Sequence, residues 1–244
     1  MNEQEHRRMR AVEDGDWWFV GKRLLVNALL QRVLTPDPNG AVLDVGCGTG
    51  ANLKLLARYG MPVGIDLAPA ALRLTAERGI GSLCAADAEH LGFADRTFNA
   101  VTALDVLEHL DHPVRALREM GRVCVPGGIV LVSVPAYPLL WSDHDVALSH
   151  RRRYTARLLR AQVEGAGLEV LRLTHAYSLC FLPALLIRQA RRLQRHRQPQ
   201  ADLGRVAAPF NALLIQYLRL EAALLPRLSL PLGTSLLCVA RAEK

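Results

Sequence analysis

The stretch that decides the fold of this chain is Ala41-Val42-Leu43-Asp44-Val45-Gly46-Cys47-Gly48-Thr49-Gly50. Its apolar residues predict a buried strand over 41–45, with Asp44 near the tip of that strand. Three glycines at alternate positions follow, and apolar residues at helical spacing resume at Leu53. Strand, glycine-rich turn and helix open a nucleotide-binding unit, because glycines let the backbone approach a ligand where a Cβ would clash.

Strand-like and helix-like segments alternate along the next 130 or so residues, which is typical of an α/β fold with a parallel sheet covered on both faces. Thr155 is positioned to cap the last of the helices. A short apolar segment, 235–241, predicts a final strand. The other strands are predicted at 62–66, 82–87, 98–107, 129–134 and 168–174, and the helices at 68–78, 113–123 and 156–165.

This pattern divides the chain into three parts. Residues 1–40 are a predicted N-terminal helical cap, and residues 41–177 with 235–244 are the core. If the final strand pairs with the strand at 168–174, residues 178–234 are a helical insertion between neighbouring strands. The insertion carries eight arginines against two carboxylates, so a net charge of +6 out of the chain's +7 is clustered there.

Composition and the two ends of the sequence bear on location. Half of the 244 residues are apolar, which is enough for a full core. The five scattered cysteines show no metal-ligand spacing and predict reduced thiols in a cytoplasmic protein. No apolar signal segment or membrane-spanning window is predicted, so any membrane contact would be peripheral, on the inner face. Nothing in the sequence predicts an oligomeric state.

The glycine turn is compatible with more than one nucleotide. Residues 46–51 satisfy a loose dinucleotide pattern, and Asp66 lies 20 residues beyond Gly46, where a ribose-binding acid is expected. Asp44 argues against NAD, because a carboxylate there would repel a pyrophosphate but can serve a cationic amino-acid group. Asp87 is positioned to accept a hydrogen bond from an exocyclic amine. An NAD- or nucleotide-sugar-dependent oxidoreductase is the alternative, although the chain has no Tyr-x-x-x-Lys pair; a non-catalytic cofactor-binding subunit is another.

Four motifs in this order resemble those of the class I S-adenosylmethionine-dependent methyltransferases: 42–50, 64–67, Asp87-Ala88 and 103–110. The resemblance implies a Rossmann-like seven-stranded sheet, mostly parallel with an antiparallel last strand, and S-adenosylmethionine as the cofactor. It assigns cofactor binding to Asp44, Gly46, Cys47, Gly48, Gly50, Asp66, Leu67, Asp87, Ala88 and Leu104.

Residues 1–40 and 137–155 resemble a subgroup related to small-molecule, quinone and cell-envelope methyltransferases, so the expected acceptor is a hydrophobic or lipid-linked small molecule. His109 and His144 are candidate catalytic residues, because a base is needed where the acceptor must lose a proton. Two of the aromatic candidates have a structural alternative. The aromatic residues 17–19 can instead act as a hydrophobic staple that holds the N-terminal helix on the core, and Tyr154 can instead pack in the core. The candidate substrate-binding residues are Trp18, Tyr137, His150 and Tyr154.

Two further ligand classes are judged from side-chain spacing. Asp143, His144 and Asp145 are adjacent, and three neighbouring side chains rarely converge on one ion, so no metal is predicted. The arginines of 178–234 lack interleaved aromatic residues, so nucleic-acid binding is not expected. They are instead predicted to meet the phosphates of an anionic membrane surface or an anionic lipid-linked acceptor, with two packed amphipathic helices as the alternative.

Overall fold

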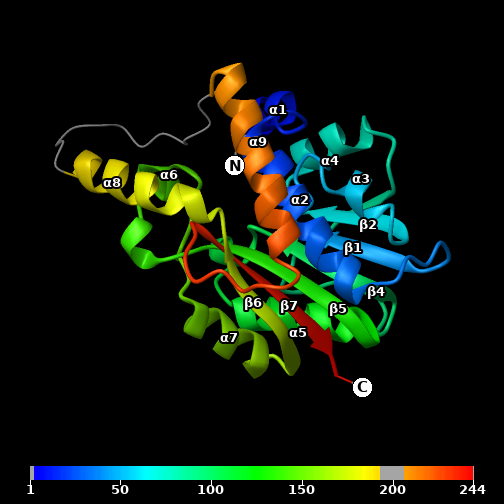
Figure 1. Ribbon diagram of the computed structural model, residues 1–244. Helices are drawn as coiled ribbons and strands as arrows, with labels where there is room; N and C mark the ends of the chain where they lie inside the picture. Colours follow the sequence, from blue (N-terminus) through cyan, green and yellow to red (C-terminus); the bar gives the residue numbers. More distant parts are fainter. Residues whose placement is uncertain (1–2, 193–205, 244) are drawn as a thin grey trace.

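The computed structural model describes residues 3–192 and 206–243 and contains a central sheet flanked by helices (Figure 1). The strands are β1 (Ala41–Val45), β2 (Met61–Asp66), β3 (Ser82–Ala85), β4 (Phe98–Leu104), β5 (Cys124–Pro135), β6 (Leu168–Ala176) and β7 (Ser235–Ala242). The α-helices are α1 (Glu3–Val12), α2 (Trp17–Val33), α3 (Leu53–Leu56), α4 (Pro69–Ala76), α5 (Pro113–Val123), α6 (Asp143–Ala147), α7 (Ala156–Gly165), α8 (Phe181–Arg192) and α9 (Ala208–Leu224). The short 3-10 helices are η1 (Leu107–His109), η2 (Pro138–Leu140) and η3 (Ser178–Cys180).

The sheet has the strand order β3-β2-β1-β4-β5-β7-β6. Strands β1 to β5 pair in parallel with their neighbours, and β7 runs antiparallel to both β5 and β6. This confirms the predicted Rossmann-like sheet of seven strands with an antiparallel last strand. The carboxyl ends of β1, β2 and β4 therefore meet at one edge, which is where ligands bind in open α/β sheets.

Several predicted boundaries differ from those in the structure. Strand β4 ends at Leu104 rather than at 107, because Asp105 has a φ of 58° and cannot continue an extended strand. Strand β5 begins at Cys124 rather than at 129, and its pairing with β4 shifts register between Phe98 and Ala100. The predicted cap of α7 is confirmed, since Thr155 accepts a hydrogen bond from the backbone N–H of Leu158.

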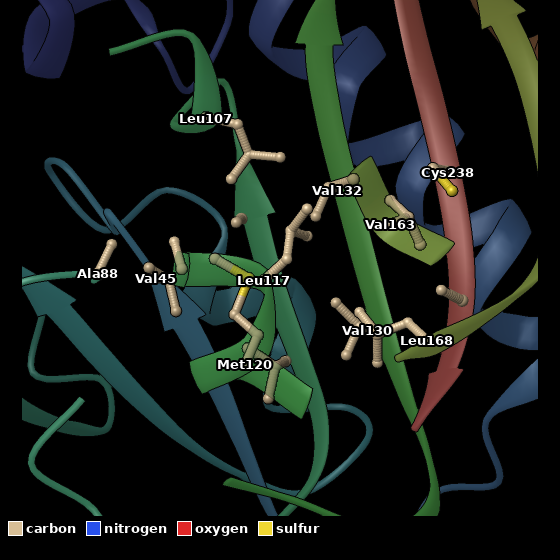
Figure 2. Packing of buried hydrophobic residues seen from close by; sticks show 14 of the residues in the cluster. Val45, Ala88, Leu107, Leu117, Met120, Val130, Val132, Val163, Leu168 and Cys238 are labelled. Atoms are coloured by element: carbon tan, nitrogen blue, oxygen red, sulfur yellow. The ribbon is translucent and has the colours of Figure 1, made fainter. Parts of the chain in front are cut away.

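Apolar side chains bury both faces of the sheet. On one face Leu117 and Met120 of α5 and Val163 of α7 pack against Val130 and Val132 of β5 (Figure 2). On the other face α2, α3 and α9 supply a second cluster of buried residues. Burying one such side chain contributes about 1.5–3 kcal/mol, so these two clusters hold the strand tips in fixed relative positions.

Helix α9 of the region 178–234 packs along helix α2 (Figure 1). The approach is close at Gly21, where a Cβ would lie 2.3 Å from a methyl carbon of Leu218. Asn211 accepts a hydrogen bond from the N–H of Trp17 (2.8 Å) and donates one to the carbonyl of Gly15 (3.0 Å). Helix α9 therefore agrees with the alternative prediction for 178–234, in which the helices of this region pack on the rest of the chain.

Part of the predicted arginine cluster lies outside the described residues, namely Arg195, Arg197 and Arg205. Within the described part, no helix combines the length and the apolar character needed to cross a bilayer.

Candidate active site

The glycine loop after β1 has a backbone that only glycine adopts easily. Gly46, Gly48 and Gly50 have φ values of 67°, 56° and 81°. A Cβ at Gly46 would also lie 2.6 Å from a methyl carbon of Val106. The N–H of Gly48 donates to Asp66 Oδ2 (2.9 Å), which ties the loop to the tip of β2.

Asp44 is buried beneath this loop with only one of its two oxygens engaged. Asp44 is only 1% exposed, and the hydroxyl of Thr102 donates a hydrogen bond to its Oδ1 at 2.6 Å. Oδ2 has no hydrogen-bond partner among the described residues. Burial raises the pKa of Asp44 to about 7. Since an unpaired buried carboxylate is costly, the site suits a ligand that brings a positive group or a hydrogen-bond donor.

The remaining predicted cofactor residues lie at the same edge of the sheet. Asp66 Oδ1 accepts from the N–H of Ala68 (2.8 Å), and Asp87 Oδ1 accepts from the N–H of Glu89 (2.8 Å). Leu67 is exposed, Leu104 is partly buried and Ala88 is nearly buried. Cys47 is buried and its N–H donates to the carbonyl of Ile65 (2.8 Å), so it shapes the loop from below.

The N-terminal helices lie directly on the glycine loop, and the sequence patterns did not reveal this contact. Thr49 Oγ1 donates to Glu13 at 2.6 Å, and Arg78 forms an ion pair with the same carboxylate at 2.5 Å. A Cβ at Gly48 would lie 3.2 Å from the methyl carbon of Met9. Residues 9–13 therefore cover the loop.

An ion pair between the buried Lys22 and the partly exposed Asp105 lies at the tip of β4. Lys22 Nζ lies 2.9 and 2.8 Å from the two oxygens of Asp105 and 3.2 Å from Ser133 Oγ. Burial is the largest single effect and raises the pKa of Asp105, but the charge and hydrogen bond of Lys22 and the hydrogen bond from Ser133 together outweigh it, so the net shift is downward. The sequence patterns did not predict a role for Lys22 at the site. The one feature that could have indicated it is a lysine among the otherwise apolar buried positions of α2.

Trp18 forms a wall beside this ion pair. Its ring stacks on that of Tyr177 with centroids 4.1 Å apart, and Lys22 Nζ lies 5.4 Å from its centroid. The Tyr177 hydroxyl donates to the carbonyl of Trp18 at 2.7 Å. Trp18 therefore links α2 to Tyr177, the residue directly before the region 178–234, and also flanks the β4 tip.

Three predicted histidines lie together beyond β4. The His150 ring is 4.8 Å from that of His109 and 6.1 Å from that of His144, measured between centroids. Burial, and next the charge of His150, lower the pKa of His109 to about 4, so His109 is neutral at pH 7.

Asp145 holds this cluster in place. The carboxylate is fully buried and lies 2.9 Å from His150 Nδ1 and 2.7 Å from Arg153 Nε. Burial alone would raise the pKa of Asp145, but His150 and Arg153 hold it well below its usual range. Asp145 thus orients His150 so that Nδ1 faces the carboxylate.

Tyr137 and Tyr154 differ from the histidines in their surroundings. Tyr154 is fully buried and its hydroxyl donates to the carbonyl of Leu107 (3.1 Å), which is the core-packing alternative left open by the sequence. Tyr137 has a φ of 58° and stacks on His175 with centroids 5.1 Å apart. Its hydroxyl donates to the carbonyl of Pro231 (3.3 Å), so it contacts the region 178–234.

Comparison with known proteins identifies the class to which this fold and loop belong. Residues 43–132 match the model of the methyltransferase domain family. The chain is 38% identical over 104 residues to the ubiquinone/menaquinone biosynthesis C-methyltransferase UbiE of Ralstonia nicotianae, covering 39% of this chain and 43% of that protein. It is 30% identical over 136 residues to the "Probable tRNA methyltransferase 9B" of Mus musculus, covering 53% of this chain and 30% of that protein.

A similar fold occurs in the complex between the Haloferax volcanii Trm112 methyltransferase activator and a methyltransferase. The TM-score is 0.65 at 19% identity, covering 99% of this chain and 95% of that chain. The chain spans less than half the length of the two relatives above. It contains a class I S-adenosylmethionine-dependent methyltransferase domain, as its motifs predict, and S-adenosylmethionine is the cofactor of that class.

Proposed function

We propose that this protein transfers a methyl group from S-adenosylmethionine to a hydrophobic or lipid-linked small molecule. The observation that carries the proposal is Asp44, whose buried Oδ2 lacks a partner in the described chain and lies below a loop shaped by glycines. S-adenosylmethionine brings a positive amino-acid group and an activated methyl on sulfur. A pyrophosphate brings negative charge, so the same carboxylate disfavours NAD.

The residues around the loop have distinct roles in this proposal. Gly46, Gly48 and Gly50 let the backbone approach the methionine part of the cofactor. Asp66 would accept hydrogen bonds from the ribose hydroxyls, because each of its oxygens already accepts one bond and retains a lone pair. Asp87 and Ala88 would contact the adenine, with Leu67 and Leu104 as apolar neighbours. Residues 9–13 would exclude water from this side.

The acceptor would bind between the β4 tip and the histidine cluster. Trp18 and the Lys22–Asp105 pair form one boundary, and His109, His144 and His150 form the other. Holding the acceptor in line with the methyl group supplies much of the rate gain. A histidine acts as a base only for an acceptor that must lose a proton.

The region 178–234 would supply a surface for a lipid. Its helices expose large apolar side chains, including Leu186 at 70% and Leu220 at 68%. The same region has a net charge of +6, so it combines apolar side chains with arginines that suit anionic headgroups. Among the described residues of this region, the exposed large apolar side chains are Leu179, Leu182, Leu186, Ile187, Val206, Phe210, Leu213, Leu220, Leu224, Leu228 and Leu232.

Two experiments test this function. Labelled S-adenosylmethionine, incubated with the protein and fractionated lipid extracts, is expected to label an extractable lipid-soluble product. Label in RNA, or in no fraction, would contradict the proposed acceptor.

For the membrane surface, more protein should pellet with vesicles containing about 30% phosphatidylglycerol than with pure phosphatidylcholine vesicles. The double variant Leu182→Asp, Leu186→Asp should lose this difference, whereas Leu158→Asp on α7 is the matched control. Equal pelleting with both vesicles would contradict the membrane role.

A further inference from the structure

A second buried carboxylate, Glu108 in η1, is not explained by the cofactor site. Glu108 is fully buried, and neither Oε1 nor Oε2 has a hydrogen-bond partner within residues 3–192 and 206–243. The cations that act on it electrostatically are engaged elsewhere, Lys22 with Asp105 and Arg153 with Asp145. Buried polar groups are nearly always hydrogen-bonded, so a carboxylate with both oxygens unpaired requires another partner.

Two imidazole rings lie beside this carboxylate. One ligand atom from each of Glu108, His109 and His150 lies within 4.8 Å of the other two. Asp145 binds His150 Nδ1 at 2.9 Å, which leaves Nε2 as the nitrogen able to bind a further group. A histidine held by a carboxylate through its other nitrogen is the usual arrangement behind a metal ligand.

We propose that Glu108, His109 and His150 bind a divalent transition-metal ion, for which Zn²⁺ fits best. Two histidines and one glutamate form the ligand set of open catalytic zinc sites. In a tetrahedral site, ligand atoms about 2.0–2.2 Å from zinc lie about 3.3–3.6 Å from one another, so side-chain movements of about 1 Å close the cluster. The sequence predicts no metal because it offers only the adjacent Asp143, His144 and Asp145; the fold instead joins residues 41 positions apart.

The place of the cluster suggests a role, which rests on the methyltransferase function proposed above. Glu108 and His109 follow the β4 tip, beside the Lys22–Asp105 pair. An ion with an open position there would take an oxygen of the acceptor. Coordination lowers the pKa of a bound hydroxyl, so the acceptor would release its proton to water and remain as an oxyanion. The acceptor class is thus a hydrophobic molecule with an ionisable hydroxyl group.

The test uses the full chain and Co²⁺ as a spectroscopic substitute for Zn²⁺. Metal-free protein, dialysed against each ion alone, is expected to bind one ion per chain, and Co²⁺ is expected to give visible absorption bands of low-symmetry coordination. Glu108→Gln and His150→Ala should each weaken binding at least 100-fold. His90→Ala, an exposed histidine outside the cluster, should leave it unchanged.

The outcomes separate this inference from the proposed function. Wild-type protein that binds no ion, or Glu108→Gln and His150→Ala variants that bind like wild type, would overturn the metal site. Calorimetry with S-adenosylmethionine on the same samples reports the cofactor site independently. Retained cofactor binding in Glu108→Gln would show that the variant is folded. If that variant does not fold, the wild-type stoichiometry and the His150→Ala variant still decide.

Discussion

The carboxyl end of β1 and the segment that follows β4 each hold a buried carboxylate, and the surroundings of the two carboxylates differ. Asp44 has one oxygen bonded to Thr102 and lies under a loop of three glycines. Glu108 has neither oxygen bonded and lies beside His109 and His150. The first is built from backbone shape and one charge, which suits a cofactor shared by many enzymes. The second is built from side chains of separate segments, which suits a particular acceptor.

The largest expected effect comes from removing the charge at β1. Asp44→Asn should weaken S-adenosylmethionine binding at least 100-fold at pH 8, because a partner for the cationic group is lost. The same variant should raise the melting temperature at pH 8, because burial raises the pKa of Asp44 from 3.8 to about 7, so stability is lost as pH rises between these two values and the loss is complete above 7. Calorimetry and thermal melts measure both, with the exposed Asp95→Asn as control. Unchanged affinity would refute the role of Asp44.

The loop itself should be the next most sensitive feature. Gly46→Ala should reduce cofactor affinity about 10- to 100-fold and cost about 1–3 kcal/mol of stability, because a Cβ there meets Val106 at a φ of 67°. Gly79→Ala is the matched control, because Gly79 has a φ of 62° but no neighbour within 4 Å of a Cβ. Equal cofactor loss in both variants would show that the clash at Gly46 is irrelevant.

The ion pair at β4 should have a moderate effect. Lys22→Met leaves Asp105 without its cation and should cost about 1–2 kcal/mol of stability, since Asp105 is partly open to solvent. Asp105→Asn in the Lys22→Met background should recover part of that loss. Chemical denaturation of the two single variants and the double variant measures the coupling. Strictly additive losses would mean that the pair does not act as a unit.

The smallest expected effect is a pH dependence from His109. Its folded pKa of about 4 lies below the ordinary value of 6.5, so the unfolded chain binds the proton first and stability falls as pH drops from 6.5 towards 4. Between pH 7 and pH 6 the loss should be about 0.7 kcal/mol. The contribution of Asp44 to stability changes with pH in the opposite direction. The quantity to measure is therefore the difference in unfolding free energy between wild type and His109→Asn at each pH. A difference that does not vary with pH would contradict the buried neutral state of His109.

The same comparison explains what could be predicted from sequence. Alternating apolar periods specify strand and helix order, and the antiparallel last strand and the helical cap were predicted from them and from the family resemblance. Asp44 and Asp66 lie at the carboxyl ends of β1 and β2, and Asp87 follows β3, so their place at one edge of the sheet is a local property. The end of β4 was predicted three residues late, because the left-handed backbone of Asp105 has no local sequence signature.

Contacts between distant segments could not be predicted. Lys22 meets Asp105 across 83 positions, and Thr49 meets Glu13 across 36. Such pairs depend on how α1, α2 and α9 pack on the sheet rather than on any repeat in the chain. Asp145 pairs with His150 and Arg153, five and eight positions along the chain, across a left-handed turn at Ser149 (φ 58°), while the sequence drew attention to its neighbour His144.

The most direct test of the central claim is titration calorimetry of the wild-type chain with S-adenosylmethionine and, separately, with NAD. We expect one S-adenosylmethionine to bind per chain, with an affinity that improves as pH rises through 7 and Asp44 ionises, and no heat with NAD. Binding of NAD without binding of S-adenosylmethionine would contradict this expectation.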